Sequence, residues 1–348
     1  MEYAPLGRTG LLVSRLSFGA MTFGTGTEVG PGARNNIDQA AADAIVGRAL
    51  DAGINLFDSA DTYGMGESEV MLGKALGKRR RDVVIATKAG FRFGKGRLDN
   101  GLNHRHIVMA VDEALTRLGT DWIDVFQLHR FDALVPYEEA ARALEQVVAQ
   151  GKVRYVGLCN HQAWQMERYL GLQQRLGYRP LTVAQMYYSL LGRDLEQDCL
   201  DFFLDTGMGT LIWSPLAGGF LTGKYRRGQP DPENARRAAF RMPPVDLELG
   251  YAVVEALERM AQPRGASIAQ TALAWILAKP WVTSILVGAS RLDQLEDNLG
   301  ALTVKLTAEE IAELDAMTKQ KARYPNLRWL PDNTDAETMR GAVGKAKA

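Results

Sequence analysis

The sequence predicts a closed (β/α)₈ barrel, the TIM barrel, in which a single domain spans residues 1–348. Short runs rich in β-branched and aromatic residues alternate eight times with longer amphipathic stretches, the pattern of successive βα units on a parallel sheet. No change of composition and no Gly/Ser linker separates these units, which favours one closed barrel over an open doubly wound sheet. The length alone would also allow two or three domains.

The elements follow in order along the chain. Strands are expected where the apolar runs are short and rich in β-branched residues, at Leu16–Gly19, Ile54–Asp58, Val83–Lys88, Trp122–His129, Val153–Asn160, Thr182–Gln185, Gly209–Trp213 and Val282–Gly288. Helices are expected where apolar residues recur with a period of three to four, at Asn36–Ala52, Glu67–Leu76, His104–Leu118, Pro136–Gln150, Ala163–Leu176, Leu195–Thr206, Leu247–Arg264 with Ser267–Ala278, and Leu292–Leu299.

Three segments fall outside this alternation, and the core of the barrel is expected to cover residues 14–318. Met1–Val13 contains turn glycines and is expected to form a small hairpin before the first strand. Leu216–Val245, after the seventh strand, is too long for a simple connection and is expected to be a functional cover or a mobile loop. The C-terminal tail, residues 319–348, is expected either to fray or to pack its first half over the site.

Composition and charge exclude several classes of function. The 41 basic and 41 acidic side chains balance, and 24% of the residues are charged, so binding to nucleic acid or to an anionic membrane is not expected. The first ten residues lack the apolar core of a signal peptide, and Lys279 and Pro280 interrupt the most apolar later stretch. We therefore expect a cytoplasmic protein whose two cysteines, Cys159 and Cys199, are reduced thiols.

Several motif-like patterns do not indicate a site. No Gly-x-Gly-x-x-Gly follows the first strand, which disfavours a Rossmann dinucleotide site. Residues 218–225 have the spacing of a P-loop, but Tyr225 stands where Ser or Thr must reach Mg²⁺. His104 and His106 are two positions apart and do not share a helix face, so no metal is expected. The basic run Lys78–Arg81 is expected to be a solvated surface.

Polar residues end three consecutive strands, and functional side chains of such barrels lie at the carboxyl ends of strands. The second strand ends at Asp58 and is followed by Tyr63, the third ends at Lys88, and the fourth ends at His129. Each residue alone has a structural explanation as a loop cap, a surface aromatic, a rim charge or a core histidine. Together they favour function, because a lysine that ends an apolar strand would be buried and unpaired without a carboxylate such as Asp58.

These four side chains form a coherent proton donor. A tyrosine titrates near ~10, so Lys88, held by Asp58, is expected to lower the pKa of Tyr63 toward the working range. His129 can donate a hydrogen bond to a carbonyl oxygen and position it. Such a group would protonate the oxyanion that forms when hydride reaches a carbonyl carbon.

At this point the sequence resembles the aldo-keto reductases, including their branch close to the potassium channel β subunits. The resemblance rests on the four residues above and on the segments Leu6–Ser14, Phe57–Ser68, Gly151–Gly157 and Trp213–Gly219, which occur in order and at family-like spacing over roughly residues 1–325. It implies a (β/α)₈ fold and the reversible NADPH-dependent reduction of an aldehyde or ketone, without a metal. Catalytic roles are thereby expected for Asp58, Tyr63, Lys88 and His129.

The same resemblance implies which residues hold NADP. Asn160 and Gln185 are expected to bind the nicotinamide carboxamide, and Trp213 is expected to stack on the nicotinamide ring. The loop from Ser214 to Lys224 is expected to wrap the pyrophosphate, and residues 288–298 to hold the adenosine end. The full expected set is Gly19, Met21, Asp58, Cys159, Asn160, Gln185, Trp213, Ser214, Pro215, Leu216, Gly218, Lys224, Gly288, Ser290, Arg291, Gln294, Asp297 and Asn298.

Three residues modify this picture. Independently of the family, a strand followed by a small-residue turn and a helix start favours an anion, and the Arg291 fork suits a 2′-phosphate, which favours NADP over NAD. Cys159 stands where the family usually has serine, so one nicotinamide contact is weakened and the site is expected to be sensitive to thiol oxidants. His161 is expected either to approach the substrate or to lie on the rim.

Two other functions compete with an active reductase. A binding or regulatory subunit of the channel β type would share the fold and cofactor, but such subunits have Asn where this chain has His129. A Schiff-base isomerase or aldolase would need Lys88 free of Asp58. The expected partner is a small carbonyl compound in an apolar, aromatic-lined pocket, and a homo-oligomer is possible; residues that would select the substrate are Met21, Phe23, Phe91, Phe93, Arg130, Trp164, Tyr187 and Trp329.

Overall fold

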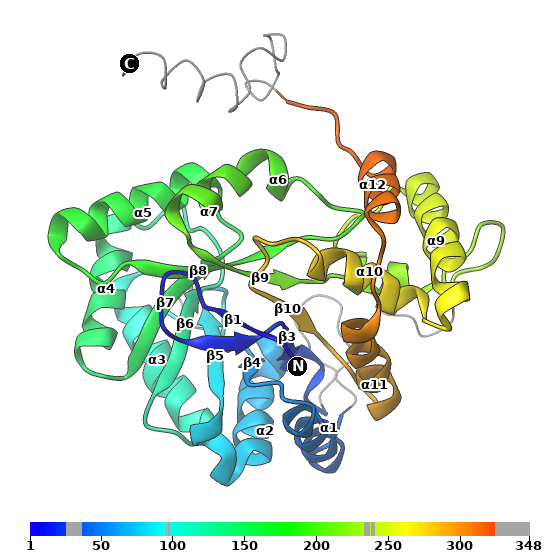
Figure 1. The fold of residues 1–348 in the computed structure, drawn as a ribbon. Coiled ribbons are helices and arrows are strands. Elements are labelled where there is room, and N and C mark those ends of the chain that lie inside the picture. Colours follow the sequence, from blue (N-terminus) through cyan, green and yellow to red (C-terminus); the bar gives the residue numbers. More distant parts are fainter. Residues whose placement is uncertain (26–36, 95, 97, 233–236, 238–240, 324–348) are drawn as a thin grey trace, which may run out of the picture.

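The protein folds into a closed parallel β-barrel surrounded by helices (Figure 1). The structure is a computed structural model and describes residues 1–25, 37–94, 96, 98–232, 237 and 241–323. Its barrel strands are ordered β10-β3-β4-β5-β6-β7-β8-β9, and β10 pairs with both β9 and β3 to close the ring. The predicted (β/α)₈ fold is therefore confirmed.

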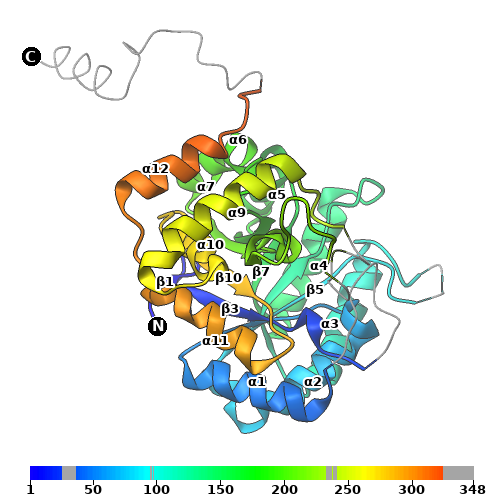
Figure 2. The same cartoon turned by 90° about the vertical axis from the view of Figure 1, so that its right-hand side faces the viewer.

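The strands and helices alternate as the sequence predicts. The barrel strands are β3 Leu16–Gly19, β4 Leu56–Asp58, β5 Val84–Ala89, β6 Ile123–Leu128, β7 Val153–Cys159, β8 Leu181–Tyr187, β9 Gly209–Trp213 and β10 Ser284–Val287. The helices are α1 Gln39–Asp51, α2 Glu67–Leu76, α3 His104–Leu118, α4 Tyr137–Ala149, α5 Ala163–Leu176, α6 Leu195–Asp198, α7 Leu200–Thr206, α9 Leu247–Ala261, α10 Ile268–Leu277, α11 Leu292–Gly300 and α12 Ala308–Met317. Figure 2 shows α9, α10, α11, α1 and α2 following one another around the barrel.

The predicted N-terminal hairpin is present and closes one end of the barrel. Strands β1 (Tyr3–Pro5) and β2 (Leu12–Ser14) pair antiparallel and lie across the barrel in Figure 1. Leu6 and Val13 have no exposed surface and pack into the barrel interior. Asn55, which precedes β4, accepts a hydrogen bond from the Ser14 backbone N–H at 2.7 Å, so the hairpin sits at the amino ends of the strands. The carboxyl ends, where function is expected, lie at the opposite end.

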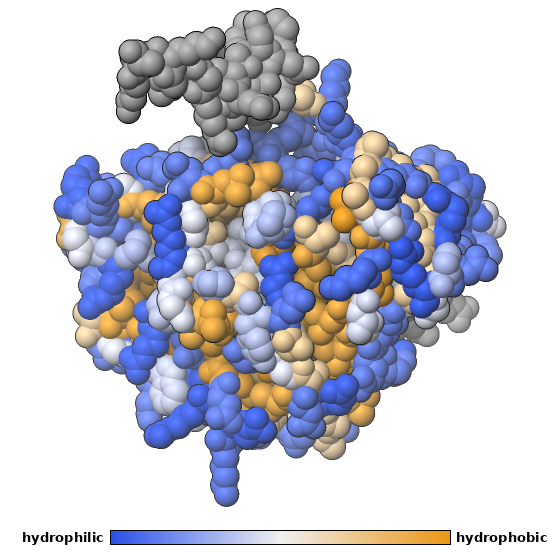
Figure 3. Space-filling model, viewed as in Figure 1, coloured by the Kyte–Doolittle hydropathy of each residue, from blue (hydrophilic) through white to orange (hydrophobic). Residues whose placement is uncertain are grey.

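The helices pack against the outer face of the barrel through one continuous apolar core. Helix α3 begins at an Asn103 cap, whose side chain accepts from the His106 N–H, and ends at Gly119 with φ 62°. Gly73 of α2 touches α3 so closely that a Cβ atom there would lie 2.2 Å from the Leu118 carbonyl oxygen. On the face seen in Figure 3, hydrophilic side chains surround several smaller apolar patches.

Some predicted boundaries are wrong. The helix expected over Leu195–Thr206 is two short helices, because the backbone at the buried Cys199 opens to φ −117°. Helix α12 was not predicted.

In the basic run Lys78–Arg81, the expectation of a solvated surface is wrong for Arg80. Its guanidinium lies 4.3 Å from the centre of the Trp122 ring and pairs with Asp124 at 2.8 Å.

The two long irregular segments are described only in part. Leu216–Val245 contains a 3₁₀ segment at Ala217–Thr222, and residues 233–236 and 238–240 lie outside the described residues. The tail is described to Arg323, which pairs with Asp194 at 3.2 Å. Residues 324–348, and with them the expected packing over the site and the role of Trp329, lie outside the described residues. None of the helices in the described part of the chain is both long and apolar enough to cross a membrane.

Candidate active site

The register of the sheet places the four predicted catalytic residues at one end of the barrel. Asp58 is the last residue of β4 and lies beside Gly19 of β3. Lys88 of β5 lies opposite Gln127 of β6, and His129 follows the end of β6. Tyr63 begins a short 3₁₀ turn after β4. Since all these strands are parallel, their carboxyl ends form one mouth.

The centre of the site is a buried ion pair between Lys88 and Asp58. The Lys88 Nζ atom donates to Asp58 Oδ1 at 2.5 Å and to the Ser59 carbonyl oxygen at 2.7 Å, and it lies 3.4 Å from the Tyr63 hydroxyl. The second carboxylate oxygen of Asp58 accepts from Gln185 Nε2 at 2.8 Å and Gln127 Nε2 at 3.4 Å. The prediction that Asp58 neutralises Lys88 is confirmed.

The charges of this pair follow from its burial and contacts. Burial is the largest single influence and lowers the pKa of Lys88, but Asp58, Tyr63 and Cys159 together outweigh it, so the net pKa is raised. Burial raises the pKa of Asp58, and the Lys88 ammonium opposes that shift. Lys88 therefore remains protonated at neutral pH. An amine held in this way cannot form a Schiff base, so the isomerase or aldolase interpretation is disfavoured.

The expected shift of the Tyr63 pKa is wrong in its net direction. Burial raises the pKa of Tyr63 above its ordinary value, and the Lys88 charge offsets only part of that increase. The sequence shows the neighbouring cation but not the depth at which the phenol is buried. Tyr63 thus holds its proton at neutral pH, and the Lys88 ammonium lies where it can stabilise a phenolate, so the arrangement is chemically able to give up a proton.

His129 completes the site as a neutral imidazole. Its ring lies edge-on to Tyr63, with centroids 5.9 Å apart, and packs against Phe91 at 4.7 Å. Burial and the charges of Lys88 and Arg130 hold the pKa of His129 well below its usual value. Its Nδ1 atom has no hydrogen-bond partner among the described residues. A neutral imidazole in this place can donate one hydrogen bond to a carbonyl oxygen beside Tyr63.

Buried charges behind Tyr63 anchor the turn that carries it, and the sequence analysis missed them. Glu69 is fully buried and accepts from Thr87 Oγ1 at 2.5 Å and Arg117 Nε at 2.6 Å. The Asp61 N–H donates to the Lys88 carbonyl oxygen at 3.0 Å. Burial, and then the nearby Glu69, raise the pKa of Asp61 to about 7. The only sequence signal for these residues is that Asp61 lies inside the segment Phe57–Ser68.

The residues expected to hold nicotinamide lie on the next strands around the mouth. Trp213 donates from Nε1 to Asn160 Oδ1 at 2.9 Å, and its ring packs against Tyr187 with centroids 5.1 Å apart. Asn160 also donates to the His129 carbonyl oxygen at 3.4 Å. The buried Gln185 donates to Asp58, so a hydrogen bond connects a residue expected to hold the nicotinamide with the Lys88–Asp58 ion pair.

Unusual backbone conformations gather at this mouth. Among the described residues other than glycine, positive φ angles occur at Met65 (50°), Asn160 (57°), Ser214 (52°) and Ala217 (50°). Each follows the carboxyl end of a barrel strand. Such conformations cost roughly 1–3 kcal/mol apiece and concentrate at ligand sites. In the segment Ser214–Lys224, with Pro215 and Leu216, the Gly218 N–H donates to Ser214 Oγ at 3.0 Å.

Buried Arg237 secures this loop. It donates from Nη1 to the Pro243 carbonyl oxygen at 2.7 Å and to that of Ala217 at 3.3 Å. The sequence analysis did not identify it, because no local pattern reveals that its partners are backbone atoms.

The residues expected at the adenosine end surround the start of α11. Arg291 forms an exposed bidentate ion pair with Asp293, in which Nε donates to Oδ1 at 2.9 Å and Nη2 donates to Oδ2 at 2.8 Å. The Ser290 N–H donates to Gln294 Oε1 at 2.8 Å, and Asn298 donates to the Gly288 carbonyl oxygen at 3.3 Å. The structure also gives Asp297 a packing role, since both its carboxylate oxygens accept from Ser267 and Gln270 at the start of α10.

Three further expectations are corrected by burial. Cys159 is 1% exposed and donates to Gln127 Oε1 at 3.7 Å; burial raises the pKa of its thiol, so sensitivity to thiol oxidants is not expected. His161 is neither on the rim nor open to substrate: it is 1% exposed and bonds the Cys159 carbonyl oxygen at 2.7 Å. Phe23 has no exposed surface and packs on Phe18, so it lines no open pocket.

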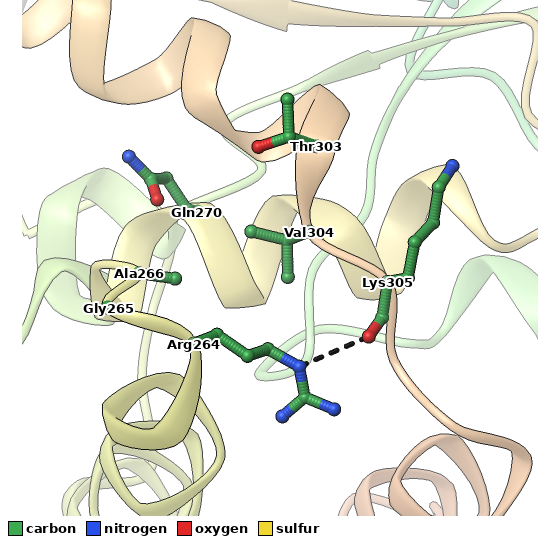
Figure 4. Close-up of a pocket in the computed structure, with 7 residues that line it drawn as sticks. All are labelled: Arg264, Gly265, Ala266, Gln270, Thr303, Val304 and Lys305. Atoms are coloured by element: carbon green, nitrogen blue, oxygen red, sulfur yellow. Dashed lines mark hydrogen bonds between the residues drawn. The ribbon is translucent and has the colours of Figure 1, made fainter.

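Other places in the described part of the chain show no sign of a ligand. No group of three or more His, Cys, Asp or Glu side chains there could hold a metal ion. A hollow of about 350 Å³ lies beside the start of α10 (Figure 4). Within it, Arg264 donates to the Lys305 carbonyl oxygen at 3.2 Å and pairs with Glu310 at 2.7 Å. Gln270 bonds Asp297, so these polar groups are satisfied within the protein.

A parallel barrel with a buried Tyr-Lys-Asp group and a neutral histidine at its mouth defines a class of carbonyl-handling barrel proteins. Comparison with known families makes that class specific: the model of the aldo/keto reductase family matches residues 15–319. The chain therefore belongs to the aldo/keto reductase family, whose members are oxidoreductases that generally use a nicotinamide cofactor.

Curated relatives resemble the chain over nearly its whole length. A probable voltage-gated potassium channel subunit beta of Oryza sativa subsp. japonica is 38% identical, over 93% of this chain and 98% of the rice protein. Versiconal hemiacetal acetate reductase of Aspergillus parasiticus is 34% identical, over 94% of this chain and all of the fungal protein. L-glyceraldehyde 3-phosphate reductase of Escherichia coli (strain K12) is 34% identical, over 90% of this chain and 92% of the bacterial protein.

Proposed function

We propose that the protein reduces an aldehyde or ketone to the alcohol, reversibly and with NADPH, and that Tyr63 gives the proton. The observation that carries this proposal is the buried chain from Asp58 through Lys88 to the Tyr63 hydroxyl, with contacts of 2.5 and 3.4 Å. A protonated phenol beside a fixed ammonium group suits the transfer of one proton to an oxyanion.

The roles of the side chains follow from their contacts. His129, as a neutral donor, orients the carbonyl oxygen toward the Tyr63 hydroxyl. Tyr63 releases its proton to that oxygen, which leaves a phenolate stabilised by Lys88. Asp58 fixes the Lys88 ammonium, and the phenolate regains a proton from solvent in the next cycle. When bound, a reduced nicotinamide supplies the hydride that the carbonyl carbon receives.

The residues at the mouth fit a dinucleotide. Trp213 donates a hydrogen bond to Asn160 and is followed by Ser214, and the positive φ angles of Asn160 and Ser214 are strained conformations that a ligand site explains. At the other end, the Arg291 guanidinium pairs with the exposed carboxylate of Asp293, an ion pair of little net stability that a 2′-phosphate can replace. This exchange supports NADPH over NADH.

A second candidate is a nucleotide-binding accessory subunit, and the rice relative is the observation that favours it. In that case the barrel would bind the cofactor and transmit its binding to a partner protein, and it would not convert a substrate. The presence of His129 together with Tyr63, Lys88 and Asp58 favours the enzyme.

The test follows NADPH absorbance with a panel of aldehydes, ketones, quinones and sugars, beside NADH, for the wild type, Tyr63→Phe and a control, Tyr178→Phe. Tyr178 begins the connection from α5 to β8, at the hairpin end of the barrel, so its hydroxyl is remote from the mouth. We expect turnover that prefers NADPH and falls by about 10²-fold or more in Tyr63→Phe only. Tight NADPH binding without turnover would instead indicate the accessory role.

A further inference from the structure

Arg130 is a cation at the mouth of the barrel, beside His129. It follows His129 directly, and its Nε atom donates to the Gly90 carbonyl oxygen at 3.4 Å, a long contact. Its guanidinium carbon lies 5.0 Å from the centre of the Phe91 ring. In the part of the chain that the structure describes, no carboxylate pairs with it.

Arg130 differs from the ion-paired arginines of the protein, and also from Arg15 and Arg237, whose guanidinium groups each donate to backbone carbonyl oxygens at 2.7 Å. Arginines elsewhere pair with glutamates across helices, as in Arg48 with Glu296, Arg226 with Glu258 and Arg264 with Glu310. The acid next to Arg130 along the chain is Asp132, and both of its carboxylate oxygens accept from backbone N–H groups, of Leu134 and Leu102, each at 3.0 Å. The local acid therefore shapes the loop and leaves the cation uncompensated.

The place of Arg130 connects it with the reacting carbonyl. Phe91 packs on His129 at 4.7 Å and carries the Arg130 guanidinium on its ring, so the imidazole, the phenyl ring and the cation form one cluster. The Arg130 charge also acts on the His129 imidazole. Lys88, the cation beside Tyr63, is neutralised by Asp58. Among the described residues, the charge left without a carboxylate in this cluster is thus positive.

We propose that Arg130 binds an anionic group of the substrate, so that the reduced carbonyl compound carries a carboxylate or a phosphate. This inference rests on the proposed function. Arg130 is half-buried, so its guanidinium has lost some of its hydrogen bonds to water. A carboxylate or phosphate can replace these bonds, because two of its oxygens can accept from the planar guanidinium at once. The Phe91 ring holds the fork in place before the anion arrives, which reduces the entropy lost on binding.

The experiment compares matched pairs of carbonyl compounds that differ in charge. 4-Carboxybenzaldehyde is paired with 4-carbamoylbenzaldehyde, and glyceraldehyde 3-phosphate with glyceraldehyde, so the two pairs separate a carboxylate from a phosphate. For the wild type, we expect kcat/KM to be at least about tenfold higher for the anionic member of one pair. In Arg130→Gln that ratio should fall toward one, mainly through KM, and Arg130→Lys should restore part of it.

Arg175→Gln is the matched control. Arg175 is an exposed arginine in the last turn of α5, at the hairpin end of the barrel, and its loss removes the same charge from the molecule. A wild type without preference for the anionic member of either pair would overturn the inference. So would an Arg130→Gln variant whose activity falls equally for anionic and neutral compounds, since that result indicates a structural role.

A binding measurement keeps the inference separate from the proposed function. 4-(Hydroxymethyl)benzoate, the alcohol form of the first probe, is titrated by calorimetry in the presence of NADP⁺, beside its neutral amide. Preferential binding of the carboxylate that Arg130→Gln abolishes would support the inference even if no carbonyl compound were turned over. Equal affinity for the two compounds, together with NADPH turnover of neutral aldehydes, would refute the inference and leave the reductase intact.

Discussion

Replacing Asp58 by Asn is expected to lower the free energy of unfolding by about 3–5 kcal/mol at pH 7, the cost of leaving a buried charge without its partner. The Lys88 side chain has no exposed surface, and the carboxylate removed lies 2.5 Å from its Nζ atom. The remaining acceptor, the Ser59 carbonyl oxygen at 2.7 Å, carries no net charge. Urea unfolding at pH 7, monitored by tryptophan fluorescence, measures the loss.

The pH dependence gives a sharper test. In the wild type, the pKa of Lys88 is raised by Asp58, so its contribution is complete below the ordinary lysine pKa and is lost only as the pH rises beyond it. In Asp58→Asn, the effect of the carboxylate is lost and burial, the largest influence on Lys88, lowers its pKa, so the unfolded chain binds more protons than the folded one. The stability of the variant then rises with pH between 7 and 10, by up to about 1.4 kcal/mol per pH unit.

The double variant Asp58→Asn/Lys88→Met is the control, because it removes the buried charge and fills its space with an apolar side chain. We expect it to recover most of the stability at pH 7 while remaining inactive. A loss below about 1 kcal/mol in Asp58→Asn, or a loss independent of pH from 7 to 10, would refute the account of the ion pair.

Further expectations concern positions away from this pair. Cys159 should react with Ellman's reagent only on unfolding, since its buried thiol has a raised pKa; fast reaction of the native protein would contradict this. Burial lowers the pKa of His161 to about 4, so stability should decrease as the pH falls from about 6.5 to 4, and His161→Asn should flatten that decrease in thermal melts. Gly73→Ala should lower the free energy of unfolding by about 2 kcal/mol or more, because the new Cβ atom would lie 2.2 Å from the Leu118 carbonyl oxygen. Gly171→Ala, in open space on a helix, should raise it by about 0.5–1 kcal/mol. Equal unfolding midpoints for the two variants would contradict the packing argument.

Much of the fold and the centre of the site can be predicted from the sequence, for separate physical reasons. The barrel is predictable because each strand and helix carries its own period of apolar residues. The contact of Lys88 with Asp58 is predictable because a lysine at the end of an apolar strand requires a carboxylate. The sign of the Tyr63 pKa shift is not, since it depends on how deeply later segments bury the phenol.

The remaining misses share one cause, which is that local patterns do not show long-range partners. Asp297 reaches back to Ser267, 30 residues earlier, and so takes part in helix packing. Arg80 finds its acid 44 residues away, at Asp124. Nothing in the sequence distinguishes Arg130 from Arg80, because only the folded chain reveals that no carboxylate of the described residues pairs with Arg130.

The hairpin that closes the amino end of the barrel also affects which parts of the protein can vary during evolution. Leu6 and Val13 are buried in the barrel interior at the amino end, whereas the candidate site lies at the carboxyl ends of the strands. Residues that stabilise the amino end are therefore separate from those of the site. Loops after the strands can be lengthened, shortened or exchanged for new substrates without opening the sealed interior. With the amino end closed, a substrate can enter and a product can leave only at the carboxyl end, so release of product and binding of the next substrate compete for the same space.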